Sequence, residues 1–268
     1  SNVARASENL ANLRGIVQED EIYSPTAQLN LARIWGSGAA FIKASAGYDF
    51  YRNNTILNRE ELDVHTGVNQ KLETCFSTLE GIYTRQQSDL DQLTVAVTKN
   101  TESLSSASLS VVCDWGSRVS WSLSAAPTWA QNSAILLKAS DNRSVPVIGE
   151  VRYDFSTFGK ISIFGEYVDA TYPYRAVQLD SSFVADGYNL YSGGVRFKRD
   201  LGTRLTATLQ LSVISLRPRV PEDLAFSGAG YSAAVTYQFT PRLDAEVFIE
   251  KAANPANAAA IDKDIQAL

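Results

Sequence analysis

The sequence predicts an all-β fold, a transmembrane antiparallel up-and-down β-barrel, from two features. Segments of about ten residues or slightly more alternate between apolar and polar side chains, as in RLTATLQLSVIS from Arg204 to Ser215, and this period of two is typical of a strand with one apolar face. The connections alternate between short turns and long polar loops. Because outer-membrane barrels have short turns at one end and long loops at the other, both features favour this class.

The expected strands have lengths close to the roughly 9–11 residues that a tilted strand needs to cross hydrocarbon. Twelve of them lie near 25–35, 39–51, 60–71, 75–86, 105–115, 119–129, 144–156, 160–171, 187–199, 204–216, 229–239 and 242–252. Residues 1–268 are then one barrel domain, with the strands in 25–252 and extracellular loops at 1–24 and 253–268. Since strand direction places both ends outside, we expect an interior portion of a barrel with about 14 strands or more.

A soluble β-sandwich also alternates apolar and polar residues, but it does not explain where the aromatic residues fall. On the apolar face they collect beside the short turns and again toward the long loops, as the two interfacial girdles of a barrel would require. The predicted girdle residues are Trp35, Trp115, Phe155, Phe197 and Phe239 beside the turns, and Tyr48, Tyr167, Tyr191 and Tyr231 toward the loops. We therefore predict localisation in the bacterial outer membrane, in contact with its lipid and lipopolysaccharide.

Charged residues repeat along the opposite, polar face and predict the wall of a lumen. The expected lining residues are Lys43, Asp49, Asp63, His65, Glu80, Glu150, Arg152, Asp154, Glu166, Arg196, Lys198, Asp244 and Glu246. A wall of mixed sign could set a transverse field and a solute preference in an open pore. The same charges could also pair with one another in a closed lumen, and the sequence leaves both alternatives open.

Cys75 and Cys113 are the only cysteines, and the expected register brings them together. Cys75 follows a short turn and Cys113 precedes one, on neighbouring strands and on the same face, where cross-strand Cβ distances are about 4.5–5.5 Å. An oxidising periplasm permits a disulfide between them. Two free buried thiols are the alternative, and a metal site is not expected with so few soft ligands.

Composition and motifs argue against several other functions. A formal net charge of −5 provides no basic excess for binding nucleic acid. The sequence contains no G-x-S-x-G, H-E-x-x-H or G-x-G-x-x-G motif, and spacing pairs no nucleophile with the single histidine, His65. We therefore expect a protein that is not an enzyme and has no cofactor, although hydrolytic activity abolished by His65→Ala would revive the enzyme hypothesis.

Four segments carry a resemblance to a known family. They are SNVARASEN at the start, AGYDFYRNNTILNREELDVHTGV from Ala46 to Val68, YTRQQSDL from Tyr83 to Leu90 and GYNLYSGGVRF from Gly187 to Phe197. The chain resembles the outer-membrane β-barrel porin family of alphaproteobacteria, of the sphingomonad type, whose genes lie among exopolysaccharide genes. The resemblance implies residence in the outer membrane and a role in passing a polysaccharide or small solutes outward.

Two functions follow as hypotheses. The first is an outer-membrane channel or export accessory for polar solutes or exopolysaccharide, with polysaccharide-export or other envelope proteins as partners. The second is a structural or docking barrel without an open pore, which anchors a surface or periplasmic assembly through its long loops.

Overall fold

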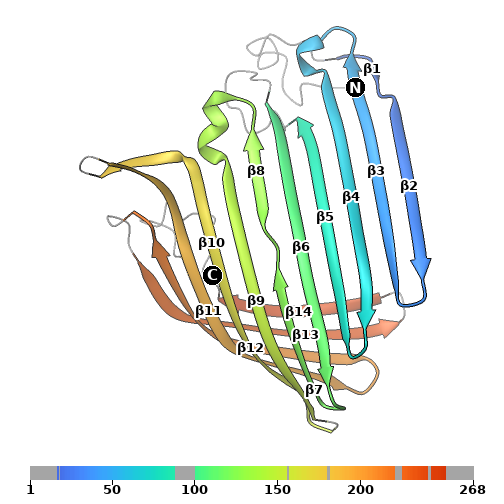
Figure 1. Ribbon diagram of the computed structural model, residues 1–268, viewed down its shortest axis with the longest axis vertical. Coiled ribbons are helices and arrows are strands. Elements are labelled where there is room, and N and C mark those ends of the chain that lie inside the picture. The colour runs from blue at the N-terminus through green and yellow to red at the C-terminus, as the bar shows by residue number, and fades with distance from the viewer. Residues whose placement is uncertain are drawn as a thin grey trace. The chain divides into compact units, whose positions relative to one another are not determined.

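The computed structural model describes residues 17, 19–87, 100–155, 157–179, 182–220, 225–240 and 243–251, and most of them are in strands (Figure 1). The strands are β1 (Ile22–Tyr23), β2 (Thr26–Trp35), β3 (Gly38–Tyr51), β4 (Arg59–Leu72), β5 (Cys75–Gln87), β6 (Thr101–Trp115), β7 (Val119–Ala125), β8 (Thr128–Asn132), β9 (Asn142–Phe155), β10 (Gly159–Leu179), β11 (Ser182–Leu201), β12 (Leu205–Pro218), β13 (Phe226–Thr240) and β14 (Leu243–Lys251). The short 3-10 helices η1 (Thr55–Leu57) and η3 (Ile135–Ser140) lie between strands. Within the described ranges, no helix is both long and apolar enough to cross a membrane.

The strands form one 14-stranded sheet in which most neighbours in sequence are neighbours in space. Its order is β1-β3-β4-β5-β6-β7-β9-β10-β11-β12-β13-β14, with β2 beside β3 and β8 beside β6 and β9. The ladders with a determined register, such as β10 with β11 and β11 with β12, are antiparallel. This meander confirms the predicted all-β antiparallel architecture.

Contacts divide the chain into two compact units. Unit 1 consists of Ser1–Asn69, Leu79–Ala107 and Thr128–Arg143, and unit 2 consists of Gln70–Thr78, Ser108–Pro127 and Ser144–Leu268. The single barrel domain over residues 1–268 remains a prediction.

The prediction of one strand at 119–129 is wrong, because this segment forms two strands. β7 ends at Ala125 and β8 begins at Thr128, so that Ala126 and Pro127 separate them. Proline has no backbone N–H to donate to a ladder, and Ala126 N instead donates to Pro146 O at 3.1 Å. The sheet continues on both sides of this interruption, since β7 pairs with β9 and β8 pairs with β6.

Other strand limits also differ from the expected ones. β1 pairs Ile22 with Tyr51 of β3 and so lies inside the segment expected to be a loop. The hairpin of β10 and β11 runs well past the expected ends at 171 and 187, with 21 and 20 residues in its strands. Its outer part contains a register shift between Tyr172 and Ala176. The expected strand lengths correspond to the thickness of the hydrocarbon layer, whereas the hydrogen bonds between β10 and β11 continue past that length.

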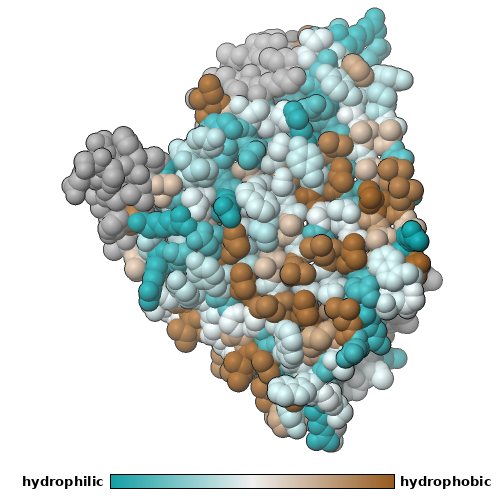
Figure 2. All heavy atoms as spheres, viewed as in Figure 1, coloured by the Kyte–Doolittle hydropathy of each residue, from teal (hydrophilic) through white to brown (hydrophobic). Residues whose placement is uncertain are grey.

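In unit 2, the register sorts side chains onto two faces of the sheet. Ile163 pairs with Val195 and Val195 pairs with Leu211, so these apolar side chains lie side by side on what we call the apolar face. Its aliphatic members are strongly exposed, including Val151 (55%), Ile163 (66%), Leu211 (56%), Val213 (65%) and Val247 (74%). An exposed apolar surface of this extent marks a surface that contacts lipid or another apolar partner. In the view of Figure 2, where β2 to β9 run down the molecule as in Figure 1, apolar side chains also gather over the middle of the visible face.

Gly194 of β11 permits a close approach to the backbone of β12. A Cβ atom on Gly194 would lie 2.1 Å from Leu211 O and 2.8 Å from Ser212 Cα. Because these are backbone atoms within a hydrogen-bonded ladder, they cannot move aside at low cost. The neighbouring Gly193 faces the opposite way, and a Cβ there would meet Phe164 O at an ordinary 3.7 Å.

We expect Gly194→Ala to lower the free energy of unfolding by about 2–3 kcal/mol, the cost of overpacking against a fixed backbone. Urea unfolding of the detergent-solubilised protein, followed by tryptophan fluorescence, measures this change. Gly193→Ala is the matched control and should leave the urea midpoint nearly unchanged. Equal midpoints for the two variants would contradict the close approach at Gly194.

Candidate functional site

A charged network lies on the polar face of unit 2, opposite the apolar face, and is centred on Glu150 and Arg196. Arg196 of β11 donates from Nη1 to Glu150 Oε2 of β9 at 2.9 Å. Its Nε and Nη2 atoms donate to Gln210 Oε1 of β12 at 3.0 and 2.8 Å. Arg152 donates from Nη2 to Glu150 Oε1 at 2.9 Å. Two guanidinium groups thus share one carboxylate, which leaves the group with a net positive charge.

Arg196 reaches Glu150 across an intervening strand. The register neighbour of Arg196 on β10 is Ser162, a small residue that is only 5% exposed. The guanidinium also lies 5.1 Å from the ring centroid of Phe164, a distance suited to a cation–π interaction. A small residue at 162 therefore lets one long side chain join three strands.

The ladder extends this network into a polar row across four strands. Arg196 pairs with Gln210, Gln210 pairs with Ser232, and Ser232 pairs with Glu250. Since directly paired residues project to the same face, the row presents guanidinium, amide, hydroxyl and carboxylate groups in sequence. We call Arg196, Gln210, Ser232 and Glu250 the polar row.

An open hollow of about 290 Å³ lies along the polar row. Its lining residues are Glu166, Val168, Leu190, Ser192, Gln210, Ser212, Ile214, Tyr231, Ser232, Glu250 and Lys251. The hollow shows that the predicted lining residue Glu166 borders a cavity. Most of its other polar lining groups, such as Ser192 and Ser212, are residues that the charge pattern did not single out.

Toward the long loops the polar face becomes apolar, which the sequence analysis missed. Ala170, Tyr188, Leu190 and Leu216 form a buried cluster, with Val168, Tyr172, Ile214 and Phe226 packed against it. These residues occupy the phase of the alternation that was expected to be polar. The signal was present in the sequence, because Val168, Ala170 and Tyr172 follow Glu166 at every second position.

The remaining predicted lining residues of unit 2 lie outside the network of Glu150, Arg152 and Arg196. Asp154 and Lys160 approach to 3.8 Å, and Lys198 pairs with Lys160 in the ladder. Asp244 and Glu246 lie on β14 opposite Gln238 and Thr236, and both are exposed.

In unit 1, His65 and Glu80 are brought together by the structure. His65 Nε2 lies 3.9 Å from Glu80 Oε2, and the imidazole ring meets the ring of Phe41 edge-on at 4.8 Å. Lys43 Nζ lies 5.7 Å from the Phe41 ring centroid. His65 thus has a carboxylate and an aromatic ring as neighbours, an arrangement compatible with a lining residue.

Asp49 and Asp63 complete the predicted set in unit 1. Asp49 accepts a hydrogen bond from Arg59 Nε near the long-loop end of β3 and β4. Asp63 is exposed and alternates in phase with His65 on β4. The assignment of all thirteen predicted residues to a lumen wall remains a prediction.

The predicted girdle residues of unit 2 lie on its apolar face by the phase of their strands. Trp35 and Tyr48 belong to unit 1. The rings of Tyr167 and Tyr191 are paired across β10 and β11 with their centroids 5.2 Å apart. At the turn end, the ring of Phe197 lies 5.3 Å from Phe158, which in turn lies 6.3 Å from Phe155. Trp35 pairs with Gly38 beside its turn, and Trp115 is 78% exposed. Phe239 and Tyr231 lie in β13, and Tyr48 lies in β3. Their interfacial role stays a prediction.

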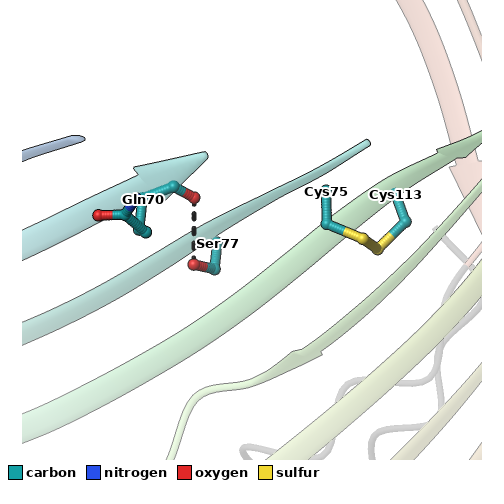
Figure 3. The surroundings of a disulfide bond; sticks show 4 residues. All are labelled: Gln70, Cys75, Ser77 and Cys113. Atoms are coloured by element: carbon teal, nitrogen blue, oxygen red, sulfur yellow. Dashed lines mark hydrogen bonds between the residues drawn. A yellow bond between two sulfur atoms is a disulfide. The ribbon is translucent and has the colours of Figure 1, made fainter. Parts of the chain in front are cut away.

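Cys75 and Cys113 form a disulfide with a Cα–Cα distance of 4.0 Å, as the sequence predicts (Figure 3). Asp114 N donates to Thr74 O at 3.0 Å beside the bond, which fixes β5 against β6 there. Ser77 Oγ donates to Gln70 O at 3.2 Å across the preceding hairpin. Cys113 pairs with Trp121 of β7, so the disulfide lies on the same face as that tryptophan.

We expect Cys75→Ser combined with Cys113→Ser to lower the free energy of unfolding by about 2–4 kcal/mol, because the unfolded chain regains the freedom of the closed loop. The urea midpoint in detergent micelles measures this loss. Wild-type protein treated with reductant serves as the control and should unfold at the midpoint of the double variant. Identical midpoints for oxidised wild type and double variant would show that the bond does not stabilise the fold.

Buried polar residues close the loop between β8 and β9 in unit 1. Asn100 and Asp141 are 1% and 2% exposed. Asn100 Nδ2 donates to Asn132 Oδ1 at 2.8 Å, and Asp141 Oδ1 accepts from Asn132 N at 2.6 Å. Lys138 pairs with Asp141 at 3.1 Å. In the described part of the chain, no group of three or more His, Cys, Asp or Glu residues could hold a metal ion.

Asp20 joins two connecting segments of unit 1 outside the strands. Its carboxylate accepts backbone N–H bonds from Glu21 at 2.8 Å, Asn53 at 2.9 Å and Asn54 at 2.7 Å. Burial alone would raise the pKa of Asp20, but the three N–H donors outweigh it and hold the pKa below its usual 3.8. The charged carboxylate therefore stabilises these contacts.

Since the folded pKa is depressed, this stabilisation is present above the unfolded value and is lost as the pH falls through the folded pKa. We expect amide hydrogen exchange at Asn53 and Asn54 to accelerate at pH 3 relative to pH 7, after correction for intrinsic rates. Asp20→Asn should accelerate it already at pH 7. Glu21→Gln is the control, because the Glu21–Arg52 ion pair is exposed on both sides and such pairs contribute little. Unchanged exchange in Asp20→Asn would contradict the assigned role.

Comparison with solved structures identifies the fold. The ferric-catecholate import receptor Fiu from E. coli K12, in its open form, matches with a TM-score of 0.55 at 9% sequence identity over 85% of this chain. The chain has the fold of an outer-membrane β-barrel. This barrel fold confirms the predicted class and agrees with the predicted localisation in the bacterial outer membrane. The match covers 52% of the receptor, so the chain spans about half of that protein's length.

The closed form of the same receptor matches with a TM-score of 0.49 at 10% identity, over 86% of this chain and 49% of the receptor. No protein-family model matches the chain. No curated protein sequence matches it either. The resemblance to the porin family of the sphingomonad type therefore remains a prediction.

Proposed function

We propose that the chain forms an outer-membrane β-barrel channel or export accessory that passes polar solutes or exopolysaccharide. The observation that carries this proposal is the contrast between the two faces of unit 2. The apolar face exposes aliphatic side chains suited to lipid, while the polar face holds the charged network and the hollow. In a membrane-spanning barrel, such a polar face forms the wall of the lumen.

The chemistry of the polar row suits hydroxyl-rich solutes. Gln210, Ser232 and Ser212 offer amide and hydroxyl groups that can both donate and accept hydrogen bonds with sugar hydroxyls. Arg196 and Glu250 place opposite charges at the two ends of the row, which produces a field across the lumen. A solute that replaces its hydration shell with these groups would move along the wall without tight binding.

The comparison with solved structures concerns the fold, so transport and its solute rest on other observations. The receptor with a similar fold is named for ferric-catecholate import, but at 9% identity the likeness concerns the fold alone. Exopolysaccharide as the cargo, and export proteins as partners, rest on the family resemblance of the sequence. His65 has Glu80 and Phe41 as neighbours, and we propose that it lines the lumen and has no catalytic role.

A docking barrel without an open pore is the second candidate. It is favoured by the mutual pairing of wall charges, since Glu150 already neutralises part of the charge of Arg152 and Arg196. Charges that satisfy each other can line a closed lumen as well as an open one.

Single-channel recording of the full-length protein in a planar bilayer distinguishes the two candidates. We expect steady conductance, and we expect Arg196→Gln to shift the reversal potential in a salt gradient toward cation preference, because a positive charge leaves the wall. The combined change Glu150→Gln and Arg152→Gln should also alter ion selectivity.

Arg199→Gln is the matched control, because it removes the same charge from the apolar face, where Arg199 lies 5.7 Å from the Phe158 ring. It should leave selectivity unchanged. A correctly folded protein that stays silent would overturn the channel and favour the docking barrel. Conductance that is equally sensitive to Arg199→Gln would show that the polar face is not the wall.

A further inference from the structure

Polar side chains replace aliphatic ones on the apolar face at the long-loop end of β10, β11 and β12. The ladder defines successive rows across these strands. Ile163, Val195 and Leu211 form an aliphatic row, followed toward the long loops by Tyr167 beside Tyr191, and then by Asp169, Asn189 and Arg217. A level formed by Gly165, Gly193 and Val213 lies between the aliphatic and the aromatic rows, so the surface changes from aliphatic to charged over four levels of the sheet.

A ring contact and a hydrogen bond position the side chains of the aromatic level. The rings of Tyr167 and Tyr191 lie 5.2 Å apart, and Tyr167 donates its hydroxyl hydrogen to Asn189 Oδ1 at 3.0 Å. Tyrosine is favoured where an apolar medium meets water, because its ring is apolar and its hydroxyl is polar. The charged level beyond it is then at the depth of lipid headgroups.

Arg219 is oriented by an ion pair on this face. Its Nη2 atom donates to both oxygens of Asp169, at 2.8 and 2.6 Å. The side chain crosses Gly187, where a Cβ atom would lie 3.2 Å from Arg219 Cδ. Glycine at 187 therefore lets Arg219 lie against the sheet beside Asn189, with its Nε and Nη1 donors not used by Asp169.

Arg217, at the long-loop end of this face, has no carboxylate partner among the described residues. Its guanidinium carbon lies 5.5 Å from the Tyr191 ring centroid, and within the described residues it makes no hydrogen bond or ion pair. The residue is exposed. Two arginines and one carboxylate leave a net positive charge, although the chain as a whole is acidic.

We propose that Arg217, together with Arg219 and Asn189, binds a phosphate group of lipopolysaccharide, the phosphorylated glycolipid of the outer leaflet. The long-loop end is the extracellular end of an outer-membrane barrel, so this face meets that leaflet. Arginine forks bind phosphate through paired N–H donors. Tyr191 supports the guanidinium, and the aliphatic rows below it contact the acyl chains. The proposal is independent of whether the polar face conducts.

Native mass spectrometry of the full-length protein in detergent tests this site. The probe is purified lipid A with both phosphates, compared with dephosphorylated lipid A, phosphatidylglycerol and inorganic phosphate. We expect the phosphorylated lipid A to bind roughly tenfold tighter than the dephosphorylated form, as loss of a charge-assisted contact implies. Arg217→Gln should abolish this difference, and Arg217→Lys should restore part of it through charge alone.

Arg199→Gln is the matched control, because Arg199 also lies over an aromatic ring of the apolar face, Phe158, but at the turn end. It should leave lipid A binding unchanged. Heat-modifiable electrophoretic mobility verifies that each variant is folded. Equal binding by wild type and Arg217→Gln would overturn the proposal. So would equal losses in Arg217→Gln and Arg199→Gln, equal affinity for phosphatidylglycerol, or equal binding of inorganic phosphate alone.

Discussion

The antiparallel ladder, with its fixed register, is the constraint on which the rest of this structure depends. A strand presents alternate side chains to opposite faces, and the ladder places residues of neighbouring strands side by side. The polar row from Arg196 to Glu250 exists only because four strands keep one register. A slip of one residue in any of them would move its charges to the apolar face. The close approach at Gly194 opposes such a slip, since a residue with a Cβ atom does not fit beside Leu211 O.

Local patterns explain why the fold could be predicted from the sequence. The alternation in β12 predicts a strand and both of its faces without any partner, because each residue reports its own environment. Cys75 and Cys113 could be paired because each adjoins a short turn, and two turns at the same end of the sheet set the relative level of the strands. The split at Pro127 could also have been anticipated, since a residue without an N–H group interrupts any ladder that needs one.

The details of the site could not be predicted in the same way. Glu150 and Arg196 are 46 residues apart in sequence and meet only because Ser162 is small and β9, β10 and β11 keep their register. The buried cluster around Tyr188 and Leu216 breaks the alternation, because at the long-loop end the side chains of the polar face pack against each other and not against water. The strand lengths were predicted from the thickness of a bilayer, which gives no information about strands that extend past it. The predicted ends of β10 and β11 therefore fall short of the observed ones.

The disulfide has a consequence for the integrity of the chain. Cys75 and Cys113 are separated by 38 positions, so the backbone between them and the S–S bond form a covalent ring. A single peptide-bond cleavage anywhere in that ring opens it without releasing a fragment. The cleaved protein keeps its mass, apart from one added water, until the bond is reduced. Electrophoresis with and without reductant therefore separates cuts made inside the ring from cuts made elsewhere. When intact cells are treated with a protease, this difference shows whether a cleavage site lies between Cys75 and Cys113.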